Sequence, residues 1–234
     1  MRTVRASAVL VVLSAALAVA SPAGGANECD GLMVCVPIAG PWVVVPTSRG
    51  VPRPDVAFQL TCPRGHVVGG LDARLSGRAI DVSFLGTLGS PVNPGITTSR
   101  SVVFVATYVG ASARAPSFKP FIGCMPATGA GSRVPTSASA FRPGRPTTRR
   151  VRTVRVRPGE TTVTQRCKTF ERLVDASHAF GFATRTPPSA SLVDGVSASQ
   201  SVRGREVVVR VRADAELADV RVVLQVHAVC ARAR

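Results

Sequence analysis

The feature that most constrains this chain is a pair of similar segments, each bounded by cysteines. Cys62 and Cys124 are 62 residues apart (124 minus 62), and Cys167 and Cys230 are 63 apart (230 minus 167). Between the cysteines, residues on the expected buried face recur in the same phase. The matching positions are Gly69, Leu71, Ala73, Leu75, Val102, Phe104, Ala106, Phe118, Pro120 and Ile122 in the first segment, and Val174, Ala176, His178, Phe180, Val207, Val209, Val211, Leu224, Val226 and Ala228 in the second. One structural unit used twice explains this phase; an accidental match of two β-rich segments is the alternative.

The apolar residues alternate with polar ones at the spacing of a β-strand. Val56, Phe58 and Leu60 lead into Cys62 at every second position, and the segment 220–230 has the same pattern before Cys230. A period of two residues is typical of strands with one buried face. The sequence therefore predicts an all-β protein of two tandem antiparallel β-sandwich domains, each closed by a disulfide. The short run 42–45 between Pro41 and Pro46 is expected to be an edge strand, or a strand confined between its prolines.

The spacing of the cysteines invites comparison with immunoglobulin domains. In those domains a bridge joins the second strand to the penultimate one, and a buried Trp lies between the two cysteines in the sequence. Trp42, however, precedes the first cysteine of its pair, and Ile122 and Ala228 stand where an immunoglobulin domain has a Tyr. Only four residues follow Cys230, too few for another strand. We therefore expect a β-sandwich without immunoglobulin topology, and no resemblance to a family is claimed.

The N-terminus is predicted to be a secretory signal peptide. Arg2 and Arg5 precede an apolar run over 6–20 that ends in Ala-Val-Ala, and Ser21, Pro22 and the following glycines stop it short of a membrane span. We expect residues 1–26 to be removed and the mature protein to be secreted, without a membrane span. The expected organisation is domain 1 over 27–125, a linker rich in Pro, Gly, Ser and Thr over 126–147, and domain 2 over 148–234.

Six cysteines in an exported chain predict three disulfides. Six cysteines allow fifteen pairings. The repeat favours Cys62 with Cys124 and Cys167 with Cys230, which leaves Cys29 with Cys35. Zinc is the competing interpretation, but the chain has no C-x2-C pair. We expect no metal and no cofactor.

The positive charge is concentrated in the second half. Of 29 basic residues, 27 remain without Arg2 and Arg5, and 13 acidic residues leave a net charge of +14. One acid-free stretch contains seven arginines: Arg142, Arg145, Arg149, Arg150, Arg152, Arg155 and Arg157. We call these seven residues the arginine strip and predict that it binds a polyanion, because guanidinium groups pair with phosphate and sulfate oxygens. The alternative is a solvated edge that blocks strand pairing, with charge that reflects the arginine preference of a GC-rich genome.

No catalytic motif occurs in the sequence. The serine-hydrolase elbow, H-E-x-x-H, the P-loop and the Rossmann glycines are all absent. His66, His178 and His227 are expected to be structural, with His178 in the buried phase and His227 in the opposite phase of its strand. Asp72 and Asp81 are the plausible carboxylate pair of domain 1, and surface charge or turn capping explains them better. We assign no catalytic residue.

Two classes of function remain. The first is a secreted, non-enzymatic binding or structural protein of the extracellular milieu or cell surface, with an anionic envelope polymer or another extracellular protein as its partner. The second is a secreted hydrolase of an envelope or extracellular polymer whose catalytic residues form no recognisable motif. Nucleic acid is not favoured, because the chain has one Trp, one Tyr and nine Phe, mostly in the buried phase, and so lacks the exposed aromatic residues that stack on bases.

Overall fold

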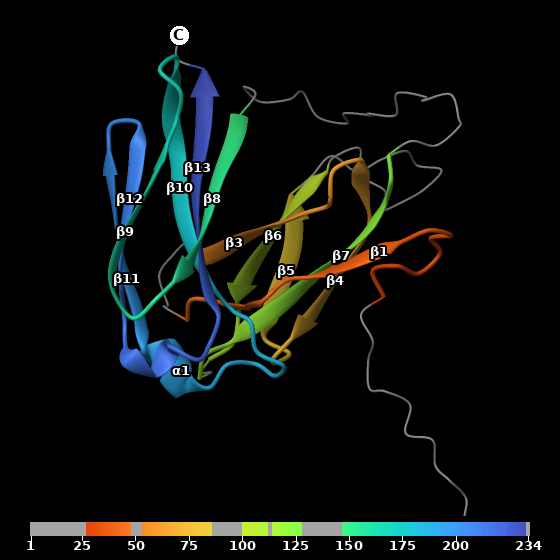
Figure 1. Cartoon of the computed structure of the whole chain (residues 1–234), viewed down its shortest axis with the longest axis horizontal. Helices are drawn as coiled ribbons and strands as arrows, with labels where there is room; N and C mark the ends of the chain where they lie inside the picture. Colours follow the sequence, from red (N-terminus) through yellow and green to blue (C-terminus); the bar gives the residue numbers. More distant parts are fainter. Residues whose placement is uncertain (1–26, 48–52, 86–99, 112–113, 128–146, 233–234) are drawn as a thin grey trace, which may run out of the picture.

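A computed structural model describes residues 27–47, 53–85, 100–111, 114–127 and 147–232. These residues form an all-β protein with several antiparallel sheets (Figure 1). The predicted signal peptide over 1–26 and nearly all of the predicted linker lie outside the described residues. The strands are β1 Val36–Ala39, β2 Trp42–Val44, β3 Asp55–Thr61, β4 His66–Leu75, β5 Ile80–Leu85, β6 Ser101–Tyr108, β7 Ser117–Pro126, β8 Thr147–Val156, β9 Gly159–Arg166, β10 Glu171–Phe182, β11 Val196–Arg203, β12 Glu206–Ala213 and β13 Val222–Arg232. A helix, α1 Ala190–Asp194, and a 3-10 turn, η1 Ala215–Leu217, lie between strands of the second half.

The first half of the chain packs two sheets around one core. β3, β6 and β5 form a three-stranded sheet in that order, and β4, β1 and β2 all pair with β7 in the other sheet. The alternating apolar residues of these strands meet between the sheets: Phe58 of β3, Phe104 of β6 and Ile122 of β7 belong to one buried cluster. This is the buried face that the period-two pattern predicts.

The second half also places strands on two sides of a core. β11, β12 and β9 form a three-stranded sheet, and β10, β13 and β8 lie side by side in the larger sheet. Val209 of β12 and Leu224 and Val226 of β13 are fully buried in the second cluster. Each half therefore has a hydrophobic core of its own.

β2 joins the two halves into one seven-stranded sheet. Its residues Trp42 and Val43 pair with Phe182 and Gly181 of β10, while Val43 and Val44 pair with the other neighbour, β7. β2 thus lies inside the sheet, and the expectation of an edge strand is wrong, whereas confinement between prolines describes it correctly. Pro41 and Pro46 flank the strand, so its ladder donors remain available on both sides.

The three disulfides expected from the sequence are present. They join Cys29 to Cys35, Cys62 to Cys124 and Cys167 to Cys230, and no described cysteine is free. Each long bridge stays within one half of the chain. Among the described residues, no helix is long and apolar enough to cross a membrane.

Candidate functional site

Four arginines of the strip lie on β8, the last strand in the order of the seven-stranded sheet. Side chains of a strand alternate between its two faces. Arg150 and Arg152 share the phase of Val154 and Val156, which pack on the second core, whereas Arg149 and Arg155 point to the opposite face. The strip is therefore two sets of side chains on two faces of one strand. Arg142 and Arg145 lie outside the described residues.

Arg150 is committed to a buried carboxylate. Its Nε donates to Glu171 Oε2 at 3.1 Å and its Nη2 to Glu171 Oε1 at 2.7 Å, a two-point contact. Oε2 also accepts a hydrogen bond of 2.8 Å from the backbone N–H of Lys168. The hydrogen bonds from Arg150 and Lys168 hold the pKa of Glu171 below its usual value, and the same pairing raises the pKa of Arg150. Only 7% of Glu171 is exposed, so this ion pair is a structural element of the second half.

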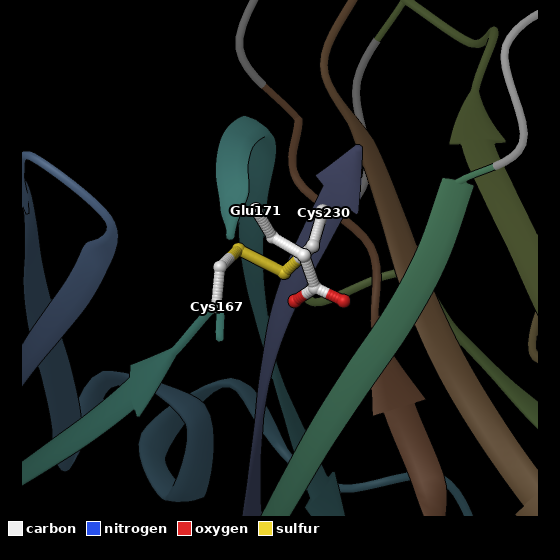
Figure 2. Close-up of side chains that lie close together, drawn as sticks. All are labelled: Cys167, Glu171 and Cys230. Atoms are coloured by element: carbon white, nitrogen blue, oxygen red, sulfur yellow. A yellow bond between two sulfur atoms is a disulfide. The ribbon is translucent and has the colours of Figure 1, made fainter. Parts of the chain in front are cut away.

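Figure 2 shows the one group of described side chains with the composition of a metal site, Cys167, Glu171 and Cys230. Their possible ligand atoms lie within 4.8 Å of one another. The two sulfur atoms, however, form a disulfide, and metals are bound by thiolates. The carboxylate is already occupied by Arg150 and the Lys168 N–H. In the oxidised protein this group is a disulfide beside a carboxylate that already has hydrogen-bond partners, so it does not fit a metal.

Arg149 belongs to a polar network at the junction between the halves. Its Nη1 lies 3.2 Å from Nδ1 of His227, whose Nε2 lies 3.1 Å from Gln225 Oε1. A guanidinium group can only donate, so Nδ1 accepts and the neutral ring carries its proton on Nε2, which donates to Gln225. Gln225 then reaches across to β3. Its Oε1 accepts from the Gln59 N–H at 2.8 Å and its Nε2 donates to the Gln59 carbonyl at 2.9 Å.

This network keeps His227 neutral. The ring is fully buried, and desolvation, with a smaller contribution from the charge of Arg149, lowers the pKa of His227 from 6.5 to about 3. Burial also lowers the pKa of Arg149, opposed by the charges of Asp175 and Asp55. A proton on Nδ1 would face the Arg149 guanidinium directly. The network therefore joins the two halves and offers no acid or base at neutral pH.

The remaining arginines of the strip are exposed. Arg152 donates from Nη1 to the Thr164 carbonyl at 3.0 Å, which holds it against the neighbouring strand β9. Arg155 and Arg157 stand at the end of β8 and in the turn to β9, with exposed side chains. Of the five described arginines of the strip, these two have exposed side chains that make no hydrogen bond or ion pair with another described residue.

The histidines and carboxylates singled out in the sequence do not converge. The expected phase of His227 is wrong, because its ring is fully buried. His178 is half-buried, in the same phase as Ala176 and Phe180, which pack against the second core, and it contacts Gln200 Oε1 at 2.9 Å. Asp72 accepts from the Asn27 N–H at 2.8 Å and from the Ala73 N–H at 2.7 Å. Asp81 lies on β5, which belongs to the other sheet. Asp72 is thus a local hydrogen-bond acceptor.

Open hollows occur on the described surface, and two of them each measure about 540 Å³. One lies over β9, β12 and β11 and is lined by hydroxyl groups with Glu160, Arg210 and Arg212. The other lies between Val44, Arg114 and Asp194. At an active centre, residues with shifted pKa values usually line a concave site. His227, whose pKa is strongly lowered, does not line either of these two hollows.

Sequence reasoning missed Gln225 and His227 as the residues that join the halves. A signal was present: two polar residues at alternate positions interrupt the outer phase of β13 between Val223 and Val229, which are apolar. Apolar residues at both the odd and the even positions of a strand indicate that both of its faces are covered, so polar residues among them are expected to be buried.

Comparison with known proteins identifies no relative. No family model, no curated protein and no solved structure matches the chain.

Proposed function

We propose that this chain is a secreted, non-enzymatic binding protein that contacts an anionic polymer through exposed arginines of its second half. Three disulfides are consistent with an oxidising, extracellular compartment. The observation that carries the proposal is the exposure of Arg155 and Arg157 at the end of β8, beside a strand whose other arginines are held by internal partners.

We further infer that the protein is a tandem repeat of one six-strand unit. The sheet order β3-β6-β5 of the first half corresponds to β9-β12-β11 of the second. The first strand of each unit pairs with its last one in the same register, since Val36 is opposite Cys124 and Thr148 is opposite Cys230. Immunoglobulin domains place their final strand beside the strand that carries the second cysteine. The first strand occupies that position here, which supports a different topology.

A polymer ligand follows from the chemistry of these arginines. Guanidinium groups at the end of an edge strand can form two-point hydrogen bonds with phosphate, sulfate or carboxylate groups. The stretch 142–157 contains no aromatic residue, so these residues offer no ring on which a sugar or a base could stack. Binding should therefore be electrostatic and should weaken steeply with salt.

Retention on immobilised dextran sulfate tests the proposal. Arg155→Ser combined with Arg157→Ser should elute at clearly lower salt than the wild type. The matched control combines Arg64→Ser and Arg78→Ser, which removes the same charge from exposed positions of the first half. Equal elution of the two double variants would show that net charge, and not this site, causes retention.

A further inference from the structure

The end of the second half that holds the Cys167–Cys230 bridge combines exposed cations with exposed apolar side chains. The β9–β10 turn, the β11–β12 turn and the last residues of β13 lie together at this end, near the label C in Figure 1. Two hydrogen bonds of 3.0 Å join the turns, from the Cys167 N–H to the Arg205 carbonyl and from Arg205 Nη1 to the Lys168 carbonyl. We call this surface the basic end and define it by its cations. They are Arg166, Lys168, Arg172, Arg203, Arg205 and Arg232.

The basic end holds more cations than acidic residues. Glu206 forms an ion pair with Arg166, Glu171 is neutralised by Arg150, and exposed Asp175 follows Val174 on β10. Four acidic residues of the second half belong instead to α1 and to the segment around η1, and α1 lies at the opposite end of the second half in Figure 1. They are Asp194, Asp214, Glu216 and Asp219. This asymmetry would turn the basic end, and not the end of the β8–β9 turn, toward a planar anionic surface.

Large apolar side chains stand exposed among these cations. Phe170 is 56% exposed and Val202 is 55% exposed, each beside a turn of the basic end, and Val174 follows on β10. The Lys168 Nζ lies 5.8 Å from the centre of the Phe170 ring. A purely ionic ligand gains nothing from Phe170 and Val202. A bilayer surface accepts apolar tips between its headgroups while the cations stay at the phosphates.

We propose that the basic end docks on an anionic lipid bilayer, with Phe170 and Val202 entering the interfacial region. This inference goes beyond the polymer contact through Arg155 and Arg157, which lie on a different part of the second half. Each cation near an anionic membrane contributes about 1 kcal/mol, equivalent to roughly five-fold in affinity.

Co-sedimentation with vesicles tests this docking. The mature, oxidised protein should bind vesicles of equimolar phosphatidylcholine and phosphatidylglycerol and should not bind vesicles of phosphatidylcholine alone. Replacing Lys168, Arg172 and Arg203 with Ser should weaken binding by about 100-fold. The matched control replaces Arg185, Arg210 and Arg212 with Ser, which removes equal charge outside the basic end and should leave vesicle binding unchanged.

A second variant separates a bilayer from a polyanion. Phe170→Ser with Val202→Ser should weaken vesicle binding by about ten-fold, because the apolar contact is lost, and should leave retention on dextran sulfate unchanged. Vesicle binding equal to wild type in this variant would overturn the proposal and leave only a basic surface. Equal losses in the two triple variants, or binding to uncharged vesicles, would overturn it as well. The variant at Arg155 and Arg157 separately decides the proposed polymer contact.

Discussion

The Gln225 side chain should be a main link between the two halves. It makes three hydrogen bonds, two to the Gln59 backbone on β3 and one to the His227 ring, and is only 5% exposed. Gln225→Leu keeps the approximate volume and removes all three. It leaves the N–H and C=O of Gln59 and the Nε2–H of His227 without these partners.

The expected cost follows from the burial of these groups. A buried polar group without a partner costs about 1–3 kcal/mol, and the Gln59 groups are only partly buried. With a partial offset from the apolar Leu side chain, the free energy of unfolding should fall by about 2–4 kcal/mol. This is a large part of the 5–15 kcal/mol typical of a folded protein.

Urea unfolding followed by tryptophan fluorescence measures this effect. Trp42 is the single Trp of the chain, is 2% exposed and pairs with β10 at the junction, so its emission reports on this region. Gln200→Leu is the control. Gln200 also hydrogen-bonds through both amide atoms, to His178 and to the Ala176 carbonyl, but it is exposed, and its loss should cost less than about 1 kcal/mol. Equal costs for the two substitutions would refute the role of the buried network.

Three further results are expected. His227 has a pKa of about 3 in the folded protein and 6.5 as its ordinary value, so the free energy of unfolding should decrease as pH falls from about 6.5 toward 3, by an amount on the order of 4 kcal/mol. Urea unfolding at several pH values measures this decrease. The same decrease in His227→Gln as in the wild type would contradict it. Arg150→Ser should lower the urea midpoint because it leaves Glu171 buried without its partner, whereas Arg155→Ser should leave the midpoint unchanged; similar midpoints would mean that the Arg150 contact contributes nothing. Replacing Cys167 and Cys230 together with Ser should lower the free energy of unfolding by about 4 kcal/mol, as measured under non-reducing conditions, and an unchanged value would contradict the stabilising role of that bridge.

The sequence predicted correctly which face of β3 enters the first core. Val56, Phe58 and Leu60 are buried as their alternation requires, and the spacing of the cysteines identified the bridges. Helix α1 was not predicted, although Ser189 caps it, accepting a hydrogen bond of 3.3 Å from the Leu192 N–H. Five residues carry too little periodicity to indicate a helix.

The prediction failed where both faces of a strand are covered. β13 buries Leu224 in the second core on one face, and on the other face His227 is buried beside Gln225, which contacts Gln59 of the first half. A rule of alternate exposure therefore assigns His227 wrongly to the solvent. For the arginine strip, the sequence showed the alternation on β8 but not the partners of the side chains. Arg150 pairs with Glu171 and Arg149 contacts His227, and these partners lie on other strands that become neighbours only through sheet pairing.

The central claim, electrostatic binding by the second half, is tested most directly by the salt dependence of affinity for dextran sulfate. For the wild type, the logarithm of the binding constant should fall linearly with the logarithm of salt concentration. Arg155→Ser with Arg157→Ser should bind more weakly at low salt and show a shallower slope, by roughly one to two released counterions. A wild-type affinity that does not change with salt, or the same slope in the variant, would contradict the claim.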